Sequence, residues 1–215
     1  MTSPASASAS RRRGKTQPRP EAAASGRPTV PPFWLLLTYK VPSEPSRVRV
    51  SVWRELKRLG ALYLQQAVCV LPDVGKVGED LDQIRQRIRN LDGTSYFFRV
   101  PPGDHEQDAS LVASFKEMAA KEYSEIVEEC RTKFVKEIEF ERFRENYSFE
   151  EAEEIRQDLE KIHRWFARVV ERDWFGGPGR TDCEQWLSTC ESLLEEFEAD
   201  VYERTSGTGR AGEAP

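Results

Sequence analysis

Between positions 33 and 100, short apolar runs alternate with apolar residues at helical spacing. Residues 33–39 are a continuous apolar run preceded by prolines, which favours a buried strand. In residues 47–59 the apolar side chains recur at steps of three and four, which predicts an amphipathic helix that ends at Gly60. The side chains expected to face the sheet are Val48, Val52, Leu56 and Leu59.

The rest of this half predicts three more strands and a second helix. Residues 62–64 and 68–71 are short strands, residues 79–91 repeat the helical spacing, and residues 95–100 form an aromatic-rich strand before two prolines. Two βαβ halves with short links are the ferredoxin-like pattern. The predicted fold class is therefore α+β, with a ferredoxin-like βαββαβ head over residues 32–103.

The second half of the chain predicts long helices. Residues 109–144 carry one apolar stripe, and two further stripes follow capping boxes, Ser148 with Glu151 and Thr181 with Glu184. Three long helices with short links predict an antiparallel helical unit over residues 104–204. Residues 1–31, rich in Ser, Ala, Pro and Arg, are expected to be a disordered basic arm, and residues 205–215 a disordered tail.

Charge is distributed unevenly along the 215 residues, although the formal net charge is only -5. Counted from the sequence, residues 1–32 carry net +5, residues 33–103 net +4 and residues 104–215 net -14. A basic first half suggests an anionic ligand or nucleic acid. The alternative is that the basic head docks on its own acidic helices.

A cluster of cations accompanies the first predicted helix. Helical geometry places four of them together opposite the apolar stripe, and a fifth lies just past the first strand; the five are Lys40, Arg47, Arg54, Lys57 and Arg58. Such a cluster could hold phosphates of DNA or another oxyanion. The alternative is an ordinary solvent-exposed helix face. Trp53, at the edge of the stripe, is expected to belong to the core rather than to a base-stacking platform.

Catalytic and metal-binding patterns are lacking in the sequence. It has two histidines, His105 and His163, and no nucleophile elbow, P-loop, HExxH or GxGxxG pattern. The Glu160–His163 pair has the spacing of a di-metal carboxylate motif, but no second copy accompanies it. We therefore expect no catalytic residue, no metal ligand and no cofactor, and a protein that is not an enzyme.

The four cysteines also lack metal-ligand spacing and are expected to be reduced core residues. Cys183 and Cys190, seven residues apart on a predicted helix, are about 10 Å apart at 1.5 Å per residue, too far for a disulfide. The longest apolar run has five residues, against roughly 20 for a membrane span. We expect no membrane partner and a cytoplasmic location.

Several segments resemble the N-terminal domain of the ChrB family of chromate-resistance proteins. The segments are Trp34–Leu37, Glu44–Arg47, Val52–Ala61, Val70–Pro72 and Arg172–Arg180, followed by a helix with Cys190 and Leu193. The resemblance covers about residues 33–203. It implies a regulator of chromate efflux genes. Longer members of the family continue into a second domain, so the resemblance implies that chemistry seated there is absent from this chain.

The head also looks like small CRISPR-associated ferredoxin-like endonucleases and the related domain of PaaX-type repressors. Those nucleases bind a catalytic metal with an Asp in a Tyr-Asp pattern after the first strand. This sequence has Tyr39-Lys40 at that place, and a lysine repels a divalent cation, so nuclease activity by this route is not expected.

Three functions remain as expectations. The leading one is a regulatory protein that acts in transcriptional control of chromate efflux through DNA or oxyanion binding, with chromate as one such oxyanion. The alternative is a non-catalytic adaptor whose acidic helices contact a protein partner. A metal-dependent nuclease or chromate reductase comes last, because no catalytic pair is visible.

Overall fold

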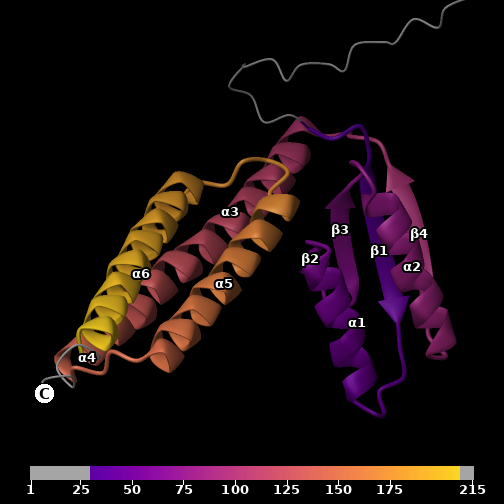
Figure 1. Cartoon of the computed structure of the whole chain (residues 1–215). Helices are drawn as coiled ribbons and strands as arrows, with labels where there is room; N and C mark the ends of the chain where they lie inside the picture. The colour runs from indigo at the N-terminus through magenta and orange to yellow at the C-terminus, as the bar shows by residue number, and fades with distance from the viewer. Residues whose placement is uncertain (1–29, 209–215) are drawn as a thin grey trace, which may run out of the picture.

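The computed structural model describes residues 30–208 and has an α+β head followed by a helical unit (Figure 1). The elements of the head are β1 (Trp34–Lys40), α1 (Arg47–Arg58), β2 (Leu62–Gln65), β3 (Val68–Pro72), α2 (Val77–Asn90) and β4 (Thr94–Val100). Each strand lies within two residues of its predicted bounds, and α2 begins two residues before its predicted start. The predicted α+β class is confirmed.

The four strands form one antiparallel sheet in the order β2-β3-β1-β4. Both α1 and α2 lie on the same face of this sheet (Figure 1). Val52 and Leu56 of α1 are fully buried against it, as the apolar spacing predicted, whereas Val48 and Leu59 are only half-buried. The helix ends at Arg58 with Leu59 as its C-cap, and Gly60 follows with a φ of 87°, a conformation that favours glycine.

The helical unit contains more segments than predicted. Its elements are α3 (His105–Glu129), a π-helical segment η1 (Cys130–Phe134), α4 (Val135–Phe143), α5 (Phe149–Arg172) and α6 (Arg180–Thr208). The helix predicted over 109–144 therefore corresponds to α3, η1 and α4 in succession. The helix α5 runs back alongside α3, and α6 reverses direction again (Figure 1).

One of the two predicted capping boxes is half formed: Ser148 caps the helix, whereas the Glu151 carboxylate accepts from the Asn146 side chain at 3.1 Å. The Ser148 hydroxyl accepts a hydrogen bond from the Glu151 backbone N–H at 3.2 Å, at the start of α5. The box predicted at Thr181 is wrong, because α6 already begins at Arg180 and Thr181 lies inside the helix. Glu184 instead accepts from the Arg180 side chain at 2.9 Å.

Residues 1–29 and 209–215 lie outside the described residues, and they include most of the predicted arm and tail. Helix α6 extends to Thr208, four residues past the predicted boundary at 204. Within the part of the chain that is described, no helix is long and apolar enough to cross a bilayer.

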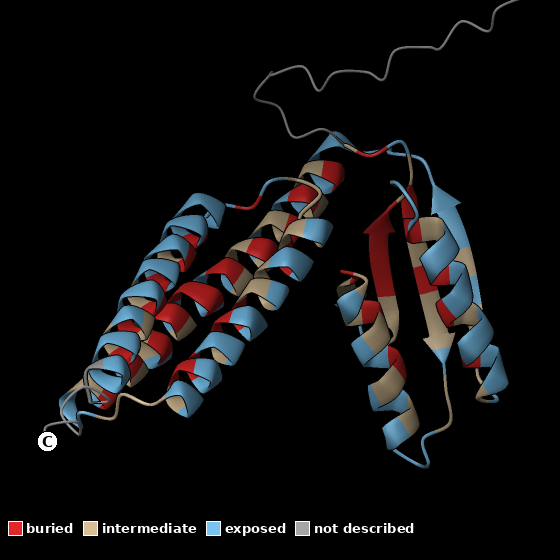
Figure 2. Cartoon of the chain, viewed as in Figure 1, coloured by how far each residue is buried: buried red, intermediate tan, exposed pale blue. Residues whose placement is uncertain are grey.

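Each unit has its own hydrophobic core, visible as the buried inner surfaces in Figure 2. Leu35, Leu37 and Ile88 are among the residues that fill the head core between the sheet and its two helices. Tyr123, Phe134 and Phe197 are the largest fully buried side chains of the helical core. Large-side-chain burial of this kind is the main source of stability for both units.

An aromatic seam joins the two units on the other face of the sheet. Trp34 of β1 stacks on Phe115 of α3, with ring centroids 6.0 Å apart and planes at 5°. The indole N–H of Trp34 donates to the buried carboxylate of Asp108 at 2.8 Å. Val70 and Val112 complete the buried part of this seam.

Gly60 marks a second contact between the units. A Cβ atom at this position would lie 2.8 Å from the ring of Trp174 and 3.1 Å from the Cβ of Arg172. The backbone at the end of α1 therefore approaches the end of α5 as closely as glycine permits. This contact fixes the C-terminal end of α1 against the helical unit.

Candidate anion-binding surface and groove

Helix α1 carries five cations, Arg47, Arg49, Arg54, Lys57 and Arg58. Within residues 30–208, none of them forms an ion pair, and the same is true of Lys40 at the end of β1. The one acidic residue of α1, Glu55, is paired with Arg87 of α2 at 2.9 Å. The head therefore presents one helix whose positive charge is not neutralised.

The five cations predicted as a cluster fall into four environments. Arg47 and Arg54 are exposed on the outer side of α1. Lys57 is half-buried, with its amine 5.7 Å from the centre of the Tyr63 ring. Arg58 lines a cleft of about 680 Å³ toward α5, and Lys40 lines a different groove. The cations are neighbours on one side of the head but do not converge on one point.

A groove of about 700 Å³ lies where β1 ends and α1 begins. The end of β1, the first half of α1 and the turn between β2 and β3 form its walls. Ala67 in that turn has a φ of 62° and its carbonyl accepts from the Tyr39 N–H at 3.0 Å, which holds the turn against β1. The lining side chains that carry chemistry are Lys40, Arg49, Trp53, Tyr63, Gln65 and Gln66.

Trp53 is not the core residue that the sequence predicted. Its side chain is 47% exposed and lines the groove. One residue along a helix is a rotation of about 100°, so the residue after the buried Val52 turns away from the sheet. Arg49 lies one turn before Trp53 and lines the same groove, which the sequence reasoning missed. The i, i+4 spacing of Arg49 and Trp53 was the available signal.

Two tyrosines form the polar floor of the groove. The hydroxyls of Tyr39 and Tyr63 are 2.9 Å apart and share a hydrogen bond. Burial raises the pKa of both phenols above the usual value of 10.0. Burial also raises the pKa of the nearby Cys69 thiol to about 12. These three groups are therefore uncharged at neutral pH, and the phenols offer hydrogen bonds rather than acid–base chemistry.

The histidines do not assemble a catalytic or metal site. His163 lies 3.0 Å from Glu191 of α6, and Glu160 pairs with Arg164 rather than with His163. His105 is the exposed first residue of α3. In the described part of the chain, no group of three or more His, Cys, Asp or Glu side chains could hold a metal ion.

All four cysteines are buried and free, which confirms the prediction of reduced core residues. Cys130 and Cys190 share a side-chain hydrogen bond inside the helical core, and this bond together with burial raises the pKa of Cys190. Burial raises the pKa of Cys183 to about 12. Cys183 and Cys190, held protonated in this way, are poor nucleophiles, whereas the hydrogen bond with Cys190 lowers the pKa of Cys130.

Comparison with known proteins gives one family. The sequence model of the family described as "Protein ChrB, N-terminal" matches residues 49–208. The protein named "Protein ChrB" from Cupriavidus metallidurans (strain ATCC 43123 / DSM 2839 / NBRC 102507 / CH34) is 30% identical over 92 residues. That match covers 43% of this chain and 28% of the relative. No solved structure matches.

Proposed function

Because the chain belongs to the family of ChrB N-terminal domains, we propose that it is a regulatory protein of chromate resistance that binds DNA through its head. Its role is transcriptional control of chromate efflux. The matched region, residues 49–208, includes most of α1 and all of the helical unit. The head is assigned to the ferredoxin-like class, which the element order βαββαβ and the strand order β2-β3-β1-β4 support.

The observation that carries this proposal is the unneutralised charge of α1. Arg47 and Arg54 are exposed, and within the described residues neither has an acidic partner. Exposed cations that lack partners are free to replace the counterions of a phosphate backbone. By contrast, three other arginines of the head, Arg85, Arg87 and Arg99, are each held by a carboxylate.

The spread of the cations favours DNA over a small oxyanion such as chromate. Residues 47–58 extend over about 16 Å at 1.5 Å per residue. A duplex presents a phosphate charge about every 1.7 Å of its axis, so a row of cations of this length can contact several phosphates. A tetrahedral oxyanion instead needs donors that converge on one point, and the five predicted residues lie in four environments.

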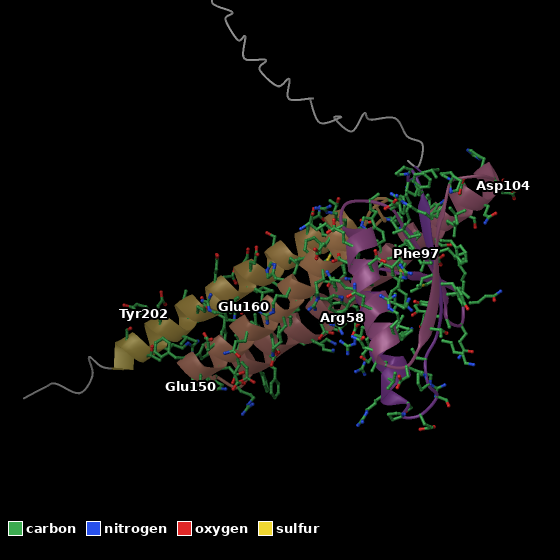
Figure 3. The ribbon with its side chains drawn as sticks, turned by 90° about the vertical axis from the view of Figure 1, so that its right-hand side faces the viewer. Arg58, Phe97, Asp104, Glu150, Glu160 and Tyr202 are labelled. Atoms are coloured by element: carbon green, nitrogen blue, oxygen red, sulfur yellow. The ribbon has the colours of Figure 1, made fainter. Side chains whose placement is uncertain are left out.

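An adaptor role is the second candidate, and one feature of the helical unit favours it. The end of the helical unit farthest from the head, marked by Tyr202 in Figure 3, exposes several aromatic rings. They are Phe140, Phe143, Phe149 and Tyr202. Clustered exposed aromatics among acidic helices are typical of protein-contact surfaces.

The test of DNA binding is a four-fold alanine variant at Arg47, Arg54, Lys57 and Arg58. Each lost phosphate contact should reduce the slope of log affinity against log salt by about 0.9, at every duplex sequence tested. The melting temperature should stay close to that of the parent, because these side chains make no ion pair among the described residues.

A matched control removes four cations that are already paired, at Lys133, Arg156, Lys161 and Arg164 of the helical unit. This control changes the net charge by the same amount but keeps the cations of α1. Its duplex affinity should therefore exceed that of the α1 variant. If the α1 variant and the parent show the same affinity and the same salt slope, the cationic face is a solvated surface and the adaptor role replaces DNA binding.

A further inference from the structure

We propose that the groove between β1, α1 and the β2–β3 turn binds a nucleotide, with the base stacked on Trp53 and the phosphate held by Lys40 and Arg49. The groove is a different surface from the outer side of α1 that carries Arg47 and Arg54. Its volume of about 700 Å³ lies within the roughly 300–1,000 Å³ of small-molecule sites.

The apolar and charged parts of the groove together define the class of ligand. Trp53 and Val50 expose 47% and 42% of their surface there, although both are large apolar side chains. An inorganic oxyanion would use the cations but leave these two side chains in water. A purely apolar ligand would cover them but remove Lys40 and Arg49 from water without a counter-charge. A flat aromatic ligand that carries an anionic group would cover the two apolar side chains and also supply a counter-charge to Lys40 and Arg49.

The remaining polar groups match the edges of a base. Gln65, the last residue of β2, and Gln66, in the β2–β3 turn, line the groove and are exposed, and an amide offers both a donor and an acceptor. The hydroxyls of Tyr39 and Tyr63 lie at the floor and remain uncharged at neutral pH. Indole stacking together with amide hydrogen bonds is the usual way in which proteins bind an unpaired base.

Two sources could supply this chemistry: a free mononucleotide, or one unpaired nucleotide of a single strand. The experiment therefore titrates the full chain with adenosine 5′-monophosphate and, separately, with a single-stranded oligothymidylate, by calorimetry. Comparable affinity for the two probes would identify a free nucleotide as the ligand. Much tighter binding of the oligonucleotide would identify a single strand.

Variants locate the site. Trp53→Ala should weaken binding of the better probe roughly tenfold or more, because stacking is lost. Trp53→Phe should retain most of the affinity, and Arg49→Ala should weaken binding and lower its salt dependence. Tyr202→Ala removes another exposed aromatic, at the far end of α6, and should have no effect.

Two results would overturn the proposal. One is the absence of binding of both probes to the parent at millimolar concentration. The other is unchanged affinity in Trp53→Ala; if that variant does not fold, unchanged affinity in both Arg49→Ala and Lys40→Ala counts instead. Duplex binding is measured on the same proteins, and Trp53→Ala should leave the salt slope of duplex binding unchanged. Nucleotide binding and duplex binding can therefore fail independently.

Discussion

Helix α1 of the head and the helical unit differ in how their cations are partnered. On α1 of the head, five cations have no acidic partner within residues 30–208. In the helical unit, several cations are paired between helices, as in Arg156 with Glu198 and Arg172 with Glu122. Arg142 reaches both Glu196 and Asp200 of α6 at 3.5 Å. The difference indicates that net charge alone does not locate a binding surface, and that α1 is distinguished by five such cations on one helix.

The contact between the two units is aromatic rather than ionic. The sequence left open that the basic head docks on its acidic helices, but among the described residues no ion pair joins a cation of the head to an acid of the helical unit. Trp34, Phe115 and Phe175 pack there instead, with centroids 5.4–6.1 Å apart. Because this contact does not use the α1 cations, they remain available to a ligand.

The largest expected effect is in the helical core. Phe197→Ala removes a fully buried ring that packs on Tyr147 with centroids 5.7 Å apart, and should lower the free energy of unfolding by about 3–5 kcal/mol. Chemical denaturation followed by circular dichroism measures it. Phe143→Ala, at a ring that is 85% exposed, is the control and should stay within about 0.5 kcal/mol of the parent. Equal losses in both variants would refute the assignment of the core.

The head should respond separately to Leu56→Ala. This side chain is fully buried between α1 and the sheet, so the loss should be about 2–5 kcal/mol. Amide hydrogen exchange resolves where it acts: protection should fall in the head more than in α5 and α6 if each core unfolds on its own. Uniform loss across the chain would show instead that the aromatic seam makes the two cores one cooperative unit.

A smaller loss of stability is expected from a substitution at the aromatic seam. Asp108→Ala leaves the indole N–H of Trp34 and the backbone N–H of Gly103 without their acceptor, which should cost about 1–3 kcal/mol. Asp108→Asn keeps an acceptor oxygen for Trp34 and should lose less. Near-ultraviolet circular dichroism, which reports the packing of Trp34 on Phe115, should change in the first variant more than in the second.

Sequence reasoning predicted the elements of the head better than its surface. The apolar period placed Val52 and Leu56 correctly, because a helix buries the residues that repeat on one face. It misplaced Trp53, because the period does not say where the sheet beneath the helix ends. The groove also depends on the left-handed backbone conformation of Ala67, which no pattern in the local sequence predicts.

The seam and the start of α6 were missed for different reasons. Strand alternation puts Trp34 and Leu36 on the face of the sheet away from α1 and α2. The sequence therefore already indicated that another element must cover these two side chains. Leu36 is half-buried there, while Trp34 is covered by α3. At α6, a matching Thr181 and Glu184 spacing was present, but the chain entered the helix one residue earlier, after the left-handed Gly179.

The smallest predicted effect tests how the helical unit bears its excess of acid. Burial raises the pKa of Glu137 above its usual 4.5, and repulsion from Asp158, Glu151, Glu141 and Glu154 raises it further. Two nearby lysines do not offset this repulsion, because Lys133 is paired with Glu129 and Lys161 with Asp158. The folded state therefore binds a proton more tightly than the unfolded chain.

The sign of the pH dependence follows from that difference. The stability that protonated Glu137 contributes is fully present below about pH 4.5 and is lost as the pH rises through the higher folded-state pKa. Glu137→Gln should accordingly be more stable than the parent at pH 7, by less than about 1 kcal/mol because the side chain is partly solvated. The gain should vanish below about pH 4.

Glu139→Gln, at an exposed carboxylate on the same helix, makes the same charge change and should show a smaller gain. Equal gains for both at pH 7 would mean that long-range net charge, rather than the carboxylates around Glu137, sets the effect.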